Sequence, residues 1–131
     1  MTDTRRSMRK ILVIDDNAVV RRLLHDMLTT ESYDVIVAGD GNSAMEALSA
    51  LSVDAVVTDL YMPGMDGLET IIELRKRYPD LKIIAMSGGS SRFSDRQADH
   101  LETARVIGAD AVLKKPFQPE ALIGALRRLL D

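Results

Sequence analysis

The chain has 131 residues, of which 46% are hydrophobic and 28% charged, a composition typical of one soluble globular domain with its own core. Its formal net charge of −3 provides no electrostatic basis for nucleic-acid binding, and the absence of cysteine excludes disulfides and thiol catalysis. No apolar run approaches the roughly 20 residues of a membrane span, and nothing resembles a secretory signal. We therefore predict a cytoplasmic protein without membrane insertion.

Short apolar runs alternate with stretches of helical length along the chain. Residues 1–9, with Arg5, Arg6 and Arg9, are predicted to form a flexible basic tail. Runs rich in Val and Ile, separated by helix-length stretches, are typical of buried parallel strands. Five such strands are predicted, at residues 10–14, 35–38, 54–58, 82–86 and 111–113.

Helices are predicted in the intervals from capping residues and apolar periodicity. Asn17 is a favoured N-cap for a first helix that ends near Glu31. The buried stripe of this helix is predicted at Val20, Leu23, Leu24 and Met27. Later helices are predicted at 43–51, 68–78, 95–107 and from Pro119 onward, with Gly108 at the C′ position of the fourth. The last helix should bury Leu122, Ile123, Leu126 and Leu129.

The alternation predicts an α/β fold of the (βα)5 type, with a doubly wound, five-stranded parallel sheet. No internal repeat or interdomain linker is evident, so residues 10–131 are expected to form one domain without an output domain. In open parallel sheets, ligands bind beyond the carboxyl ends of the strands, near the point where the strand order reverses. Residues that follow the strands are therefore the candidates for a functional site.

Four predicted strands are followed by residues that can handle a phosphoryl group, namely Asp15 with Asp16, Asp59, Ser87 and Lys115. Three carboxylates a few Å apart repel one another by roughly 1–4 kcal/mol per pair, so a cation is required. Mg²⁺ is suitable because it takes hard oxygen ligands and binds through one or two carboxylates plus phosphate. The strand ends therefore predict a site for a divalent cation and a phosphoryl group.

Each of these residues alone has an ordinary structural interpretation. Asp15 and Asp16 would suit a helix N-terminus, Asp59 a turn, Ser87 a loop and Lys115 a solvated surface. The combination favours a functional site, because independent turn residues have no reason to meet at one crevice.

The strand-end motifs together resemble those of response-regulator receiver domains of two-component signalling, in particular stand-alone, chemotaxis-regulator-like ones. The resemblance covers nearly everything from Ile11 to Leu130 and rests on Asp15-Asp16, the Asp59-Leu-Tyr-Met-Pro-Gly-Met-Asp-Gly67 segment, Ser87 and Lys115-Pro-Phe117. It implies a flavodoxin-like sheet with strand order 2-1-3-4-5. By this resemblance Asp59 is the phosphoacceptor, the nucleophile that takes a phosphoryl group from histidine.

The resemblance also implies roles for the other motif residues. Mg²⁺ (or Mn²⁺) would bind Asp16, Asp59 and the backbone carbonyl of Tyr61, with Asp15 acting mainly through water. Ser87, the N–H of Gly88 and Lys115 would contact the phosphoryl group. Structural roles fall to Pro63 and Gly67, which fix a tight loop after the nucleophile, and to Pro116, which follows a cis peptide in the family.

The implied protein is a signalling phosphoacceptor rather than an enzyme. Slow self-dephosphorylation is compatible with this role. Its phosphoryl donor would be a sensor histidine kinase or a histidine phosphotransfer protein. Its downstream target would bind the face formed by the fourth helix, fifth strand and fifth helix. The protein would be a monomer or a weak dimer. The alternatives are a degenerate receiver that only binds proteins and an Asp-nucleophile phosphatase. A phosphatase of that kind has a second Asp where this chain has Tyr61.

Two features depart from the family pattern. Val112 lies three residues before Lys115, where many receivers have a Tyr or Phe whose rotation reports phosphorylation. Ser87 and Lys115 are also 28 positions apart, several more than in most relatives, with the extra residues around 88–95. We therefore expect phosphorylation to act mainly through the 88–94 loop and the start of the fourth helix.

Overall fold

The computed structural model describes residues 8–60, 67–87, 102–115 and 118–131. The strands are β1 (Lys10–Ile14), β2 (Asp34–Ala38), β3 (Ala55–Asp59), β4 (Lys82–Ser87) and β5 (Ala111–Lys114). The helices are α2 (Ala18–Thr30), α3 (Gly41–Ala50), α4 (Gly67–Arg77) and α6 (Pro119–Leu130), and residues 102–107 are helical as well. The predicted tail over 1–7, the 88–94 loop and the predicted helical residues 95–101 lie outside the described residues.

The five strands form one parallel sheet in the order β2-β1-β3-β4-β5, which confirms the predicted α/β fold and strand order. From β1 the chain first adds β2 on one side and then returns to place β3 on the other side. The order of addition therefore reverses between β1 and β3, and this reversal is where open α/β sheets bind their ligands. β1 and β3 are the strands that precede Asp15 and that end at Asp59.

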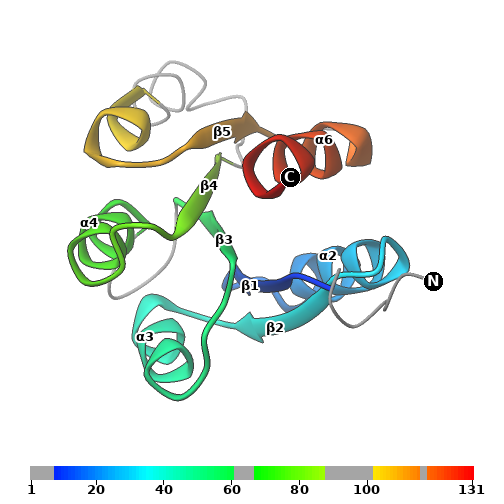
Figure 1. The fold of residues 1–131 in the computed structure, drawn as a ribbon, viewed down its shortest axis with the longest axis horizontal. Coiled ribbons are helices and arrows are strands. Elements are labelled where there is room, and N and C mark those ends of the chain that lie inside the picture. Colours follow the sequence, from blue (N-terminus) through cyan, green and yellow to red (C-terminus); the bar gives the residue numbers. More distant parts are fainter. Residues whose placement is uncertain (1–7, 61–66, 88–101, 116–117) are drawn as a thin grey trace.

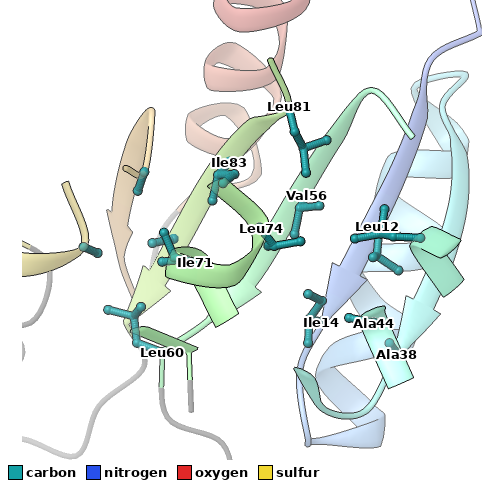
Figure 2. Packing of buried hydrophobic residues seen from close by; sticks show 14 residues of the cluster. Leu12, Ile14, Ala38, Ala44, Val56, Leu60, Ile71, Leu74, Leu81 and Ile83 are labelled. Carbon is teal, nitrogen blue, oxygen red and sulfur yellow. The ribbon is translucent and has the colours of Figure 1, made fainter. Parts of the chain in front are cut away.

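Alternate side chains of the strands point to opposite faces of the sheet, and each face has its own hydrophobic core. Figure 1 shows α3 and α4 on one side of the sheet and α2 and α6 on the other. Leu12 and Val56 pack with Leu74 of α4 on the first side (Figure 2). Ile11 and Val13 belong to the second cluster, with residues of α2 and α6. The helices on both faces thus fix the sheet whose carboxyl edge carries the candidate site.

The predicted helix faces are largely confirmed, with one error in α2. Leu122, Ile123 and Leu126 of α6 are buried as predicted. Leu23, in contrast, is 63% exposed, while Leu28 is fully buried. Spacing alone placed Leu23 beside Leu24, but the structure buries α2 along a narrower stripe, so neighbouring positions on the helix surface face solvent.

Acidic side chains at the amino ends of the strands are paired with main-chain donors. Asp54 Oδ2 accepts a hydrogen bond from Lys10 N–H (2.8 Å), and Asp110 Oδ2 accepts one from Ile83 N–H (2.8 Å). Arg75 of α4 also donates to Asp110 Oδ2, over 2.8 Å. These carboxylates strengthen the sheet and provide a contrast to the acidic residues at its other edge.

The ends of the described elements agree with the predicted ones to within two residues. Gly108, at the end of the helical residues 102–107, has φ +135°, a backbone angle that favours glycine and agrees with its predicted C′ position. No helix within the described ranges is long and apolar enough to cross a membrane.

Candidate functional site

The acidic pair lies in the turn between β1 and α2. Asp15 is 1% exposed, whereas Asp16 is exposed. The N–H of Asp15 donates to the Ala38 carbonyl over 3.1 Å, so the pairing of β1 with β2 continues one residue past the strand. The Asp15 side chain then accepts a hydrogen bond on Oδ1 from Asn17 N–H (2.9 Å). Asp15 is thereby fixed beneath the surface while Asp16 faces solvent.

Asn17 confirms its predicted role as the N-cap of α2. Its side-chain Oδ1 accepts hydrogen bonds from the N–H groups of Val19 (2.9 Å) and Val20 (3.2 Å). An N-cap of this kind satisfies helix donors that otherwise have no partner. The helix therefore begins immediately after the acidic pair, and its positive N-terminal end favours the nearby carboxylates.

Asp59 is the last residue of the central strand β3 and is 7% exposed. The pairing of β3 with β4 extends past it, because Leu60 N–H donates to the Met86 carbonyl over 2.9 Å. Gly67, the first residue of α4, packs so closely that a Cβ there would overlap the backbone of Asp59 and Leu60. The absence of a side chain at Gly67 thus allows α4 to begin against the end of β3.

Among the described residues, three carboxylates and one lysine meet at this edge of the sheet. One carboxylate oxygen from each of Asp15, Asp16 and Asp59 lies within 4.8 Å of the other two. Lys115 Nζ lies 3.2 Å from Asp15 Oδ2 and 3.9 Å from Asp59 Oδ2. The main chain places Lys115 there, because its N–H donates to the carbonyl of Ser87 over 2.8 Å.

The charge of this cluster fits a divalent cation. One lysine cannot balance three carboxylates, and each close pair of like charges costs roughly 1–4 kcal/mol. The donors are all hard oxygens, and the exposed Asp16 leaves the cluster open to water. Mg²⁺ prefers such donors and keeps several waters when it binds. The residues present therefore fit Mg²⁺.

Ser87, the last residue of β4, is fully buried. Among the described residues its Oγ has no hydrogen-bond partner. A buried hydroxyl without a partner costs about 1–3 kcal/mol, so such groups are rare and require an explanation. In the sheet, β4 pairs with β3 through Asp59 and Met86, which places Ser87 one residue beyond the Asp59 level.

The remaining predicted site residues have different outcomes. The structure brings together Asp15, Asp16, Asp59 and Lys115. Tyr61, Pro63, Gly88 and Pro116 lie outside the described residues. Val112 is partly buried and packs against the core cluster on the α3 and α4 side of the sheet.

Sequence reasoning missed Arg21, a residue in the second turn of α2. Its Nη1 donates to the main-chain carbonyl of Asp15 over 2.7 Å. An arginine six residues after an aspartate is too common a spacing to predict this contact. Only the path of the chain from β1 into α2 reveals it.

Comparison with known sequences places most of the chain in a protein family. The family described as "Response regulator receiver domain" matches residues 11–127. The "Response regulator MprA" of Mycolicibacterium vanbaalenii is 40% identical over 121 residues, which cover 92% of this chain and 50% of that protein. The chain thus spans about half the length of the curated relatives that it matches.

Comparison with solved structures gives the same fold. A response regulator receiver domain protein from Clostridium thermocellum has a TM-score of 0.85 and 26% identity, and the match covers 94% of each chain. The response regulator protein TrrA of Thermotoga maritima, solved in complex with Mg²⁺-BeF, has a TM-score of 0.77 and 34% identity. That match covers 94% of this chain and 100% of TrrA.

Proposed function

This chain belongs to the response-regulator receiver domain family, and from that premise we propose that it accepts a phosphoryl group on Asp59 in a Mg²⁺-dependent reaction. Receiver domains are signalling phosphoacceptors rather than metabolic enzymes. One observation carries the proposal: the carboxylates of Asp15, Asp16 and Asp59 gather within 4.8 Å beside Lys115 at the reversal point of the sheet.

The proposed reaction is a phosphoryl transfer from a phosphohistidine. An oxygen of the Asp59 carboxylate forms a bond to phosphorus as the phosphorus–nitrogen bond breaks. The electron pair of that bond stays on the imidazole nitrogen, which takes up a proton, and Asp59 becomes an acyl phosphate. A carboxylate is a weak nucleophile, so the protein contributes mainly by positioning the reactants and by stabilising charge on the transferring oxygens.

The acidic residues are proposed to hold the cation in two ways, directly and through water. Mg²⁺, when bound, neutralises the carboxylates and the phosphoryl oxygens. We assign Asp16, Asp59 and the carbonyl of Tyr61 as direct ligands, with Asp15 acting through water. Asp15 suits the indirect role because Asn17 N–H and Lys115 Nζ already donate to its two carboxylate oxygens.

Lys115 and Ser87 would contact the transferred group. Lys115 Nζ lies 3.9 Å from Asp59 Oδ2, so its point charge can follow the negative charge from the carboxylate to the phosphoryl oxygens. The Ser87 hydroxyl can donate to a phosphoryl oxygen, which would give this buried group a partner. The N–H of Gly88, which lies outside the described residues, is proposed as a second donor to the phosphoryl group.

The phosphoryl donor is a sensor histidine kinase or a histidine phosphotransfer protein. The downstream target is proposed to bind the face formed by the helix ending at Ile107, β5 and α6, which lie along one end of the sheet in Figure 1. Val106, which is 77% exposed, is a large apolar side chain of that helix available to a partner.

Incubation with acetyl phosphate and Mg²⁺, followed by intact mass measurement, tests the proposal. The wild type should gain one phosphoryl group, and Asp59→Asn should gain none, because the amide cannot form the acyl phosphate. Asp54→Asn is the matched control, since Asp54 lies just before the start of the same strand and bonds Lys10 N–H. This control should be phosphorylated like the wild type.

Two results would contradict the proposal. Equal phosphorylation of Asp59→Asn would show that the assigned residue is wrong. No mass increase in the wild type, either with acetyl phosphate or with a phosphohistidine protein donor, would instead identify a degenerate receiver that acts only by binding other proteins.

A further inference from the structure

The hydrogen bond from Arg21 reaches the peptide group that joins the two acidic residues. Arg21 Nη1 donates to the Asp15 carbonyl over 2.7 Å, and this carbonyl belongs to the peptide group between Asp15 and Asp16. A peptide group is planar, so holding its oxygen also fixes the direction in which the chain enters Asp16. A charged donor makes such a bond about twice as strong as a neutral one.

The flanking peptide groups are held as well, but by other means. In the peptide group before Asp15, the N–H of Asp15 donates to the Ala38 carbonyl (3.1 Å). In the peptide group after Asp16, the N–H of Asn17 donates to Asp15 Oδ1 (2.9 Å). Three successive peptide groups of the β1–α2 turn are therefore anchored. The middle one depends on the side chain of Arg21.

Gly39, directly after β2, leaves room for the guanidinium. A Cβ at this position would lie 3.2 Å from Arg21 Nη1, the same nitrogen that bonds Asp15. The described glycine with a positive φ is Gly108 and not Gly39, so an alanine at 39 would meet a tight contact without backbone strain. Alanine there should displace the guanidinium by a few tenths of an Å.

Arg21 and its neighbour Arg22 differ in their exposure and in the groups that they contact. Arg22 is 83% exposed and lies 3.7 Å from Asp26 on the same helix, an ordinary surface pair. Arg21 is partly buried, and within the described ranges it takes part in no ion pair. Its Nη1 donates instead to the main chain of the acidic turn.

We propose that Arg21 is a positioning residue of the acidic cluster: by holding the Asp15 carbonyl, it orients Asp16 for the cation. This inference rests on the proposed function of the cluster as a Mg²⁺ and phosphoryl site. Two effects of removing Arg21 oppose each other. Loss of its positive charge would strengthen Mg²⁺ binding, whereas loss of the orientation would weaken it, so the sign of the change separates the two roles.

The test is the Mg²⁺ dissociation constant, measured by calorimetric titration at fixed ionic strength on unphosphorylated protein. Arg21→Ala should bind Mg²⁺ roughly tenfold more weakly, at the lower end of the range for residues that orient metal ligands. Arg21→Lys should recover part of the affinity, because the ammonium can still donate to the carbonyl. Gly39→Ala should weaken binding slightly, and Arg22→Ala should match the wild type.

The proposal is overturned if Arg21→Ala binds Mg²⁺ as tightly as the wild type or more tightly, even if its urea midpoint falls, because that result describes a structural or purely electrostatic residue. It is also overturned if Arg22→Ala weakens binding equally. A wild type that binds Mg²⁺ but accepts no phosphoryl group contradicts the proposed function alone. A phosphorylated wild type with unchanged Mg²⁺ binding in Arg21→Ala contradicts this inference alone.

Discussion

At the scale of one residue, the proposed role of Ser87 opposes its effect on stability. Its buried hydroxyl has no partner among the described residues, so it should destabilise the unphosphorylated protein. We expect Ser87→Ala to raise the free energy of unfolding by about 1 kcal/mol, the lower end of the penalty for an unpaired buried group. The same variant should be phosphorylated more slowly by acetyl phosphate, because the alanine methyl cannot donate to a phosphoryl oxygen.

Urea denaturation and intact mass measured over time check the two expectations for Ser87→Ala. Ser87→Thr is the matched control, since it keeps the hydroxyl and adds a methyl group. A variant with alanine that is less stable than the wild type and is phosphorylated at the wild-type rate would contradict both the energetic argument and the assigned role.

Which site residues could be predicted depends on what positions them. Asp59 and Ser87 end buried strands, and the carboxyl ends of parallel strands share one edge, so their neighbourhood followed from the order of the runs. Arg21 could not be predicted in this way. Its side chain reaches back from α2 to the carbonyl of Asp15, a contact that leaves no repeating pattern in the sequence.

At the scale of one element, the C-terminal end of α2 contains a residue with a strained backbone. Ser32 has φ +70°, while its N–H donates to the Thr29 carbonyl and the next N–H, of Tyr33, donates to Leu28. This arrangement is a Schellman motif, in which the left-handed position is usually glycine. Ser32→Gly should raise the free energy of unfolding by about 0.5 kcal/mol, since relief of the left-handed strain exceeds the added entropy of the unfolded chain.

Thermal unfolding of Ser32→Gly and Ser32→Ala tests this expectation. Alanine also has a Cβ, so it keeps the strain and should not raise the melting temperature. A glycine variant that melts at or below the temperature of the alanine variant would show that the strain at this position is negligible.

The start of α3 makes stability depend on pH. The N–H and side chain of Ser43 donate hydrogen bonds to Asp40 and lower the pKa of that carboxyl below its usual value of 3.8. Because the folded state favours the ionised form, this stabilisation is fully present above the ordinary carboxyl pKa and is lost as pH falls through the lowered pKa. Asp40→Asn has a cap that does not titrate.

Urea midpoints of the wild type and Asp40→Asn at pH 6 and pH 3 measure this effect. The stability of the wild type relative to the variant should fall on acidification. A difference between the two proteins that stays constant between these pH values would contradict the lowered pKa.

The elements themselves were predictable because short apolar runs and cap residues are local signals. Asn17 and Gly108 marked a helix start and a helix end that the structure contains. Burial around α2 was predicted less well, because the predicted stripe was too wide. Leu28 follows Leu24 by four residues and shares its buried face, whereas Leu23 lies about 100° from Leu24 around the helix and is exposed. Tertiary packing decides how wide a stripe of the helix is buried.

At the scale of the whole molecule, the two edges of the sheet treat acidic residues in opposite ways. At the amino edge, Asp54 and Asp110 accept main-chain N–H groups, and Arg75 pairs with Asp110 over 2.8 Å. At the carboxyl edge, three carboxylates share one lysine. Helices pack on both faces of the sheet (Figure 1), and the two hydrophobic cores that they form stabilise the fold against the repulsion between these carboxylates. This contrast agrees with the proposed role of the carboxyl edge in binding a cation.

This contrast predicts that the order of stability of the wild type and Asp16→Asn depends on Mg²⁺. Without Mg²⁺, Asp16→Asn should unfold with a free energy about 1 kcal/mol higher than the wild type, because it removes a water-exposed negative charge within 4.8 Å of two others. At a Mg²⁺ concentration of about 100 times the dissociation constant, the wild type should gain about 2.7 kcal/mol by binding linkage. The variant has a neutral amide in place of the carboxylate, so it should gain much less and the order should reverse. Asp54→Ala removes the side chain that accepts from Lys10 N–H, and should be less stable than the wild type under both conditions. Urea unfolding at low ionic strength measures all three proteins, and an equal response of the wild type and Asp16→Asn to Mg²⁺ would exclude Asp16 as a ligand.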